Sequence, residues 1–245
     1  MKPWFLENPT LLDELKILID LKYATLNTSI ENAVVYIRGT LFIKSLEGKE
    51  LGRYKIEIII PDDYPNSAPI LRETGDKFNK VADRHFNAID NTACLFFRDA
   101  KYKYFPKGSS IVDFIEGPIK NFFLWQIDYD LNGGKSSLGG LDHGTFGLIQ
   151  FYKEELGVND EESVFRFLVL FDSKVVPRAK KCFCGSGSLL KDCHIQKFRA
   201  LKQSIPRKDA KKSLNELRDY MDRMQSLKQK YGKEAVDGAV KQIRG

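Results

Sequence analysis

Four potential metal ligands stand close together near the C-terminal end of this chain: Cys182, Cys184, Cys193 and His194. They form two short pairs with eight residues between them. Structural zinc sites use four nitrogen or sulfur ligands in a tetrahedron, and two short clips joined by a tight turn supply them with little ordered chain. The sequence therefore predicts a structural zinc site. Because four ligands fill the coordination sphere, a catalytic zinc with a bound water is not expected.

The compartment follows from the same cysteines. Clustered thiols beside a histidine are typical of metal binding in a reducing environment, where disulfides do not persist. No apolar run approaches the roughly 20 residues that a membrane span requires. The first 16 residues carry acidic side chains where a signal peptide needs an uninterrupted apolar stretch. We therefore expect a soluble, cytoplasmic protein that makes no membrane contact.

The hydrophobic pattern predicts helices and strands in separate blocks. Residues 8–24 have leucines at helical spacing, and two β-branched, aromatic-rich runs at 32–45 and 52–60 are typical of a hairpin. A proline-rich stretch at 61–70 and an irregular stretch at 72–93 come next. A long helix is expected from Ser109 or Ser110, with a kink or break at Gly117-Pro118. This order indicates an α+β fold.

The C-terminal third is predicted to be helical. One helix is expected at about 144–156, and Asn159 is expected to cap the next. Ser213 and Glu216 form a capping-box pattern that predicts the start of a final helix, which ends near Gly232. We expect four parts: a main domain at 1–157, a helix and linker at 158–180, a zinc knuckle at 181–196 and a helical tail at 197–245.

The positive charge is concentrated in this tail. Residues 195–245 contain 14 Lys and Arg against 6 Asp and Glu, whereas the rest of the chain is close to neutral. A solvated helical face is one interpretation of such a tail. Contact with a nucleic acid or an acidic protein partner is the other.

The spacing of the cysteine cluster resembles the SEC-C motif, first recognised at the C-terminus of the bacterial preprotein translocase ATPase. The matching features are C-x-C-G-S-G, eight residues between the second and third ligands, and a final Cys-His pair. The resemblance covers about 15 residues. It implies a small docking element for protein or nucleic-acid partners, with Zn²⁺ in a structural role.

Cys94 lies outside this cluster. Taken alone, a cysteine before an apolar run is typical of a small buried side chain. However, the chain passes from a strand through Pro61-x-x-Tyr-Pro-x-x-x-Pro69 to His85-x-Asn87 and then to Cys94. This order resembles the ubiquitin-conjugating enzymes, in which an antiparallel meander flanked by helices leads to a His-Pro-Asn element and a thioester-forming cysteine. The resemblance covers about residues 10–155.

The resemblance implies a role for each matching residue. Cys94 receives the C-terminus of a ubiquitin-like modifier as a thioester and passes it to an amine. The Asn87 amide donates to the oxyanion or braces the loop. His85 orders that loop. Asp128 or Asp130 is a candidate for the acid that flanks the incoming amine.

Several departures from the family pattern stand beside these matches. Phe86 replaces the middle proline of the His-Pro-Asn element. Cys94 comes seven positions after Asn87, whereas the spacing in eukaryotic members is eight positions. No tryptophan follows the cysteine at the position where family members usually have one. Residues 141–152 resemble the H-G-x-x-G element of prokaryotic members, which places His143 either near the thioester or in a structural role.

Those prokaryotic members occur in operons with antiphage signalling or ubiquitin-like genes. The implied partners are an activating enzyme, a ubiquitin-like modifier or the C-terminus of a modified signalling enzyme, and a target amine. Three alternatives stay open. The first is a catalytically inactive scaffold of the same fold. The second is a cysteine hydrolase that uses Cys94 with His85 or His143. The third is an adaptor in which the zinc knuckle and basic tail bind nucleic acid or protein.

Overall fold

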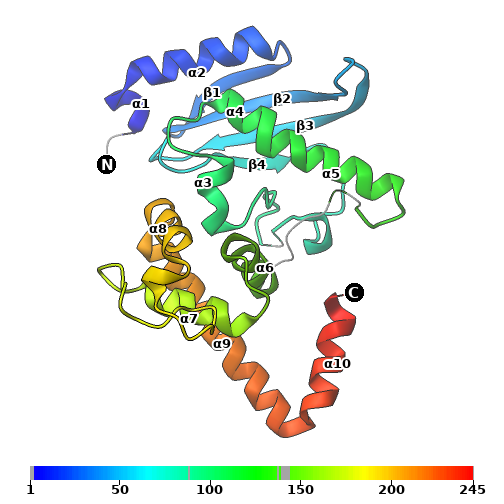
Figure 1. Cartoon of the computed structure of the whole chain (residues 1–245). Coiled ribbons are helices and arrows are strands. Elements are labelled where there is room, and N and C mark those ends of the chain that lie inside the picture. Colours follow the sequence, from blue (N-terminus) through cyan, green and yellow to red (C-terminus); the bar gives the residue numbers. More distant parts are fainter. Residues whose placement is uncertain (1–2, 88, 137, 139–143, 245) are drawn as a thin grey trace. The chain divides into compact units, whose positions relative to one another are not determined.

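The computed structural model describes residues 3–87, 89–136, 138 and 144–244, with side chains as far as residue 240. The chain divides into two compact units, residues 1–140 and 141–245. Figure 1 labels the elements of both units. Within the described residues, no helix is both long and apolar enough to cross a membrane.

The first unit begins with helices α1 (Trp4–Glu7) and α2 (Pro9–Lys22). The Asn8 side chain accepts a hydrogen bond from the Leu11 amide at 3.3 Å, and Pro9 occupies the first turn, where its missing N–H leaves no hydrogen bond unmade. The buried side chains of α2 recur at helical spacing and are those of Leu12, Leu15 and Ile19. The helix expected from the leucine spacing is therefore present.

Four antiparallel strands follow in the spatial order β1-β2-β3-β4. They are β1 (Leu26–Glu31), β2 (Val34–Lys44), β3 (Glu50–Ile60) and β4 (Ile70–Glu73). Asn32 and Ala33 join β1 to β2 with φ of 51° and 61°, the two positive values that tight two-residue hairpins need. The sequence pattern predicted only β2 and β3, because β1 and β4 are short and largely polar.

One long helical segment packs against this sheet. It consists of α4 (Ile111–Phe114), a π-helical turn at Ile115–Ile119 and α5 (Lys120–Leu131). Ser110 and Asp113 form a capping box at its start. The irregularity expected at Gly117-Pro118 is this π-helical turn, which accommodates the proline while the helical segment continues into α5. Phe123 of α5 stacks on Tyr54 of β3 with ring centroids 4.2 Å apart.

The second unit is helical. It contains α6 (Gly144–Leu156), α7 (Glu161–Phe171), α8 (Ile195–Ser204), α9 (Arg207–Tyr231) and α10 (Lys233–Arg244). Its core is aromatic, since the buried Phe167 ring lies within 5.5 Å of the rings of Tyr152, Phe171, Phe183 and Phe198. Asp160, rather than Asn159, caps α7 by accepting the Ser163 amide at 2.7 Å.

The start of α9 differs from the prediction. The helix begins at Arg207, after Pro206, and Ser213 is fully buried inside it. Leu214 and Leu217 are also buried, and α9 contacts α7 and α6, so the first half of the expected tail helix belongs to the core of the second unit. Gly232 ends α9 with a φ of 86°. The chain then forms α10, which the sequence pattern did not predict.

Candidate functional site

A narrow hairpin brings His85 and Cys94 together. The Cys94 amide donates to the His85 carbonyl oxygen at 2.7 Å, and the Asn87 amide donates to the Thr92 carbonyl oxygen at 2.9 Å. Phe86 and Ala93 form an antiparallel bridge between these two bonds. The His-x-Asn element and the cysteine are therefore opposite strands of one short ladder, although nine positions separate them in the chain.

The Asn87 side chain braces this hairpin. Its amide nitrogen donates to the Thr92 hydroxyl at 2.7 Å, and that hydroxyl donates to the Asp90 carboxylate at 2.7 Å. The Thr92 amide donates to the same Asp90 oxygen at 3.0 Å. These hydrogen bonds from Thr92 hold the pKa of Asp90 below its usual range. Thr92 and Asp90 were not predicted from the sequence as part of this site, although an aspartate two residues before a threonine is typical of a side-chain-stabilised turn.

Phe86 anchors the hairpin to the core. Its side chain is only 2% exposed, and it meets the Phe122 ring edge-on with centroids 5.4 Å apart. On the other strand of the hairpin, the Ala93 amide donates to the Leu71 carbonyl oxygen of β4 at 2.8 Å. Phe86 thus supplies buried apolar contact, and the sheet fixes the segment that leads to Cys94.

Helix α5 holds the residues that precede the hairpin. The buried Gln126 side chain donates to the Arg84 carbonyl oxygen at 2.7 Å and accepts from the Arg84 guanidinium at 3.2 Å. The same guanidinium pairs with Asp130. His85 has a left-handed backbone, with a φ of 55°, and its ring lies edge-on to Trp125 with centroids 4.5 Å apart. Arg84, Trp125 and Gln126 were not identified from the sequence, because they act through distant contacts.

The two candidate acids already have partners. Asp130 is bound to Arg84, and Asp128 accepts hydrogen bonds from Asn132 and Ser136, each at 2.9 Å. Asp128 therefore orders the residues after α5, and Asp130 holds Arg84 against α5. His143 lies outside the described residues.

The Cys94 side chain is partly buried. This burial raises the pKa of its thiol above the usual range, because a low-polarity surrounding disfavours the thiolate. The protonated thiol is therefore the resting form near neutral pH. The site resembles a positioned thiol more than the low-pKa thiolate of a cysteine hydrolase.

The raised pKa makes the reactivity of Cys94 strongly pH-dependent. Since only the thiolate is alkylated, the rate should rise about tenfold per pH unit and should still be rising at pH 9. Iodoacetamide labelling of the zinc-loaded chain, followed by intact mass spectrometry from pH 6.5 to 9.5, measures this rate, with Cys94→Ser as the blank. A plateau below pH 8 would show that the thiolate is stabilised instead.

The four predicted metal ligands come together in the second unit. Their ligand atoms all lie within 4.8 Å of one another. Cys184 Sγ is 3.7 Å from Cys193 Sγ, which matches the edge of about 3.8 Å that a tetrahedron with zinc–sulfur bonds of about 2.3 Å requires. His194 Nδ1 lies 3.3 Å from Cys182 Sγ and 3.0 Å from Cys193 Sγ, so Nδ1 is the nitrogen that faces the cluster. These residues are close enough to bind one metal ion.

Short-range structure sets up the cluster. The Cys182 amide donates to the Ser188 carbonyl oxygen at 2.8 Å, and Gly185 and Gly187 turn the chain with φ of 78° and 82°. After the 3-10 turn Leu190–Asp192, Cys193 and His194 lie directly before α8. The predicted tight turn between the two pairs of ligands is present.

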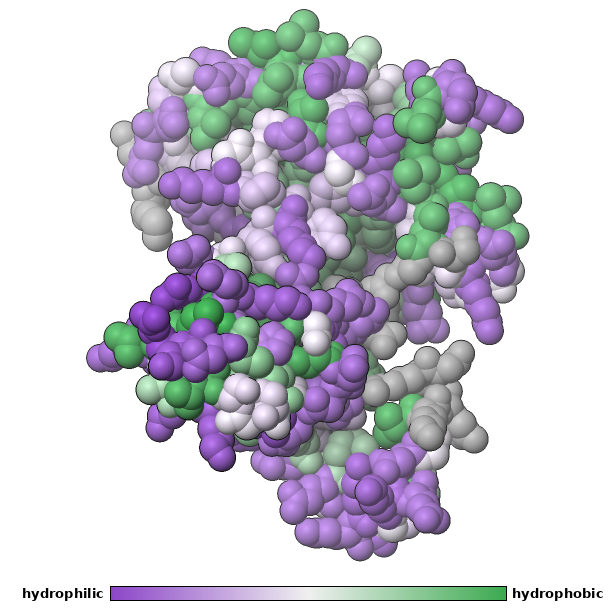
Figure 2. Space-filling model, viewed as in Figure 1, coloured by the Kyte–Doolittle hydropathy of each residue, from purple (hydrophilic) through white to green (hydrophobic). Residues whose placement is uncertain are grey.

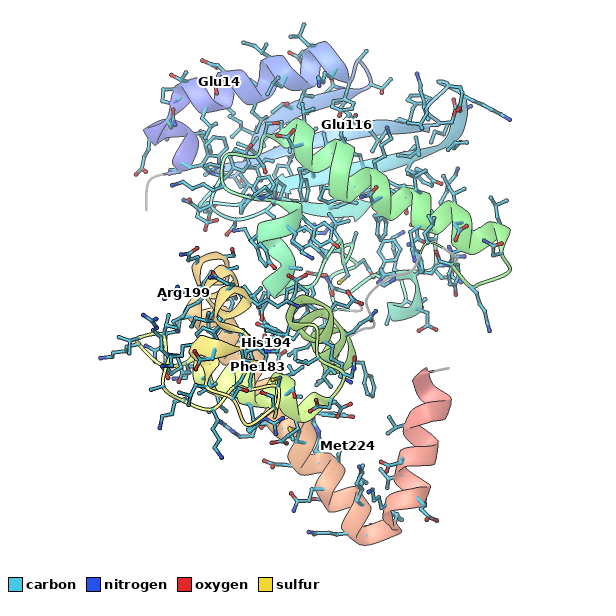
Figure 3. The ribbon with its side chains drawn as sticks, in the orientation of Figure 1. Glu14, Glu116, Phe183, His194, Arg199 and Met224 are labelled. Carbon is cyan, nitrogen blue, oxygen red and sulfur yellow. The ribbon has the colours of Figure 1, made fainter. Side chains whose placement is uncertain are left out.

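The cluster is attached to the helical core through the residue between its first two ligands. Phe183 is fully buried, its ring centroid lies 5.3 Å from that of Phe167, and Arg166 donates to its carbonyl oxygen at 2.8 Å. Figure 3 labels Phe183 and His194 beside each other in this unit, and their ring centroids are 5.1 Å apart. The knuckle therefore packs as part of the second unit.

Burial and hydrogen bonding act oppositely on the thiols. Burial raises the pKa of Cys182 to about 11. Burial also acts to raise the pKa of Cys184, but hydrogen bonds from the Ser186 hydroxyl and amide and from Cys182 and Cys193 outweigh it and lower that pKa to about 7. A metal ion must therefore displace at least the Cys182 proton on binding.

The proximity of Cys94 to the His-x-Asn element and the clustering of the four Cys and His side chains are both features of the geometry of this chain itself. Comparison with protein-family models, curated proteins and solved structures gives no match.

Proposed function

We propose that the first unit is a ubiquitin-conjugating-type acyltransferase with Cys94 as its nucleophile. The Cys94 thiolate attacks the thioester that joins a modifier's C-terminal carbonyl to an activating enzyme, and the enzyme's thiol leaves. An amine of the target then attacks the Cys94 thioester, an amide bond forms, and the Cys94 thiolate is released. The modifier is a ubiquitin-like protein or the C-terminus of a modified signalling enzyme.

The pairing of His85 with Cys94 carries this proposal. The 2.7 Å bond between the Cys94 amide and the His85 carbonyl oxygen places the cysteine opposite the His-x-Asn element at a fixed position beside β4. Such a rigid position favours a thiol that must meet two successive protein partners in the same geometry. The order of elements supports the family likeness, since α2, a four-stranded antiparallel meander, the cysteine hairpin and a long helix follow one another (Figure 1).

The test is a charging reaction. The purified chain is mixed with ATP and with the activating enzyme and ubiquitin-like modifier from the same genome, and is analysed by non-reducing electrophoresis. An adduct of one modifier per chain that dithiothreitol removes supports the proposal. An adduct that survives dithiothreitol, or no adduct while the activating enzyme itself is charged, contradicts it.

Asn87 has two amide hydrogens, and Thr92 accepts one of them. Asn87→Ala should therefore charge almost normally. If the second hydrogen serves the oxyanion, discharge to free lysine should slow by about 10²–10³. Single-turnover discharge of the thioester measures this rate.

Thr92→Val is the matched control for Asn87→Ala. It removes the acceptor that braces Asn87 but keeps the amide donor. If both variants slow discharge equally, Asn87 only braces the hairpin. A much larger effect of Asn87→Ala supports direct action on the oxyanion.

We also propose that the ion of the Cys/His cluster is zinc and that its role is structural. Three thiolates and one imidazole nitrogen are the donor set that zinc prefers in closed sites, and the 3.7 Å sulfur–sulfur distance fits its bond lengths. Bound zinc would link the turn at Cys182 and Cys184 to the start of α8 at Cys193 and His194. The SEC-C likeness of the spacing supports the same assignment.

From the resemblance to prokaryotic conjugating enzymes, we propose that the reaction serves cytoplasmic antiphage defence. A genome in which this gene stands beside a ubiquitin-like gene or a cyclic-nucleotide synthase would support that setting.

An inactive scaffold of the same fold is the second candidate. The raised pKa of Cys94 and the engagement of Asp128 and Asp130 by other side chains favour it, because neither a thiolate nor a carboxylate is held ready. The charging reaction distinguishes the two, since a scaffold accepts no modifier.

A further inference from the structure

We propose that the second unit binds the phosphate backbone of nucleic acid through a basic surface formed by the knuckle and the start of α9. Residues 173–212 contain 12 Lys or Arg and 2 Asp, whereas residues 213–245 contain 7 Lys or Arg and 5 Asp or Glu. The positive charge is thus concentrated around the knuckle and not along the terminal helix. This inference is independent of the thioester reaction.

The knuckle itself brings four of these cations together. The Lys191 amide donates to the Arg178 carbonyl oxygen at 3.2 Å, and the Leu190 amide donates to the Lys180 carbonyl oxygen at 2.8 Å. Lys181 pairs with Leu189 in the same small ladder. The side chains of Arg178, Lys180, Lys181 and Lys191 are therefore carried by two adjacent segments, and all four are exposed.

Three of the remaining cations make hydrogen bonds or an ion pair inside the unit. Lys197 donates to the Leu156 carbonyl oxygen at 2.9 Å, and Lys202 donates to the carbonyl oxygens of Phe171 and Ser173 at 2.5 and 2.7 Å. They cap the carbonyl ends of α6 and α7. The third is Arg207, which pairs with Asp172 at 3.0 Å. These contacts explain part of the basic composition without any ligand.

The other exposed cations have no such explanation. In the part of the chain that the structure describes, no acidic side chain pairs with the four knuckle cations or with Lys208, Lys211 and Lys212 of α9. Seven like charges within 35 residues raise the free energy of the isolated unit, and an anionic polymer offsets that repulsion by releasing its counterions. Figure 2 shows strongly hydrophilic residues over α8 and the knuckle.

The loop between the cations suits close approach of a backbone. Gly185, Ser186, Gly187 and Ser188 are all exposed and small, and a Cβ at Gly187 would meet no atom within 4 Å. The Ser186 hydroxyl and amide already donate to Cys184, so the lysines around this loop are the donors left for phosphate oxygens. Most of these cations are lysines, which act as point charges and lack the planar guanidinium group with which arginine makes paired hydrogen bonds. We therefore expect binding with little sequence preference.

The experiment measures binding of the zinc-loaded full chain to fluorescein-labelled 20-mer RNA, single-stranded DNA and duplex DNA of mixed sequence. Fluorescence anisotropy is recorded between 50 and 200 mM NaCl. The triple variant Lys180→Glu, Lys181→Glu, Lys191→Glu should weaken binding at least tenfold. It should also reduce the slope of log Kd against log salt for the duplex by about 2–3, because each lost phosphate contact removes about 0.9.

The control is Lys44→Glu, Lys49→Glu, Lys107→Glu in the first unit. These three lysines are also exposed and carry no ion pair among the described residues, so the net charge changes by the same amount. The control should keep the affinity and slope of the wild type within about twofold. Equal losses in both triple variants would show a general charge effect and overturn the assignment of the surface.

Two further measurements identify the partner. Poly-glutamate, added at the same concentration of negative charge as the nucleic acid, should compete only weakly for the protein. Phosphatidylserine vesicles should not retain the protein at 150 mM NaCl. Equal competition by poly-glutamate, retention on the vesicles, or no nucleic-acid binding by the wild type at 50 mM NaCl would each overturn the proposal. Zinc content and circular dichroism of every variant confirm that folding is unchanged.

Discussion

Cys94→Ala is expected to abolish formation of the thiol-sensitive adduct, with a loss of at least about 10³ in charging rate. The reason is chemical, since the covalent bond to the modifier is made by the Cys94 sulfur and no other side chain can supply it at that position. Single-turnover charging with excess activating enzyme measures the rate. Asn87→Ala, which leaves the sulfur in place, provides the comparison under the same conditions.

A change in folding can be separated from a change in chemistry. Cys94 is only partly buried, so removal of its sulfur should cost about 1 kcal/mol and lower the melting temperature by a few degrees at most. Cys94→Ser is the matched variant, because its hydroxyl keeps the size of the side chain. It should give either no adduct or an oxyester that dithiothreitol does not remove. Charging that persists in Cys94→Ala would exclude an enzymatic role for this cysteine.

Loss of the metal ion is expected to have the largest effect on stability. Cys193→Ser, or dialysis against a chelator, should reduce zinc from about one ion per chain to near zero and destabilise the second unit by several kcal/mol. Without the ion, the turn at Cys182 and Cys184 is held near α8 only by backbone hydrogen bonds within the knuckle and by ring packing of Phe183 on His194. The buried ring of Phe183 then loses the restraint that holds it against Phe167.

The first unit should keep its stability in the same experiment, because its buried cluster consists of its own residues. Elemental analysis gives the zinc content, and thermal melting followed by circular dichroism gives the helical transition. Ser186→Ala is the control, since the Ser186 hydroxyl lies 3.7 Å from Cys193 Sγ but is not one of the four ligands. Unchanged zinc in Cys193→Ser, or loss of zinc in Ser186→Ala, would contradict the assigned ligand set.

The pH dependence of zinc binding has a definite sign. In the metal-free state, burial raises the pKa of the Cys182 thiol to about 11, so this group carries a proton that zinc must displace. Apparent zinc affinity should therefore rise as the pH rises from 6 to 8, and acid should release the ion.

Local patterns were sufficient where neighbouring residues make the structure. The ligands at 182–184 and 193–194 are close in the chain, and the glycines between them permit the turn, so the cluster could be predicted from spacing alone. The same holds for α2 and for the helix start at Ser110, where the cap and the hydrophobic period are local. The mixed α+β character followed from the order of these patterns.

The local pattern was misleading where a distant contact decided the outcome. The S-x-x-E pattern at Ser213 predicted a helix start, but Ser213 is buried and α9 had already begun at Arg207. The helix at 144–156 was included in a main domain ending at residue 157, and in the structure its Tyr152 packs against Phe167 of α7. Neither result can be read from a short window, because burial depends on which segments pack together.

The sequence by itself determined the Cys/His cluster, much of the helix and strand character and the position of the lone cysteine after a His-x-Asn element. Only the tertiary structure decided that Thr92 braces Asn87, that Phe86 is buried against Phe122, and that Phe183 attaches the knuckle to α7. The physical reason is that spacing fixes what neighbouring residues can do. Hydrogen-bond partners and apolar contacts between distant segments depend on the packing of the whole unit.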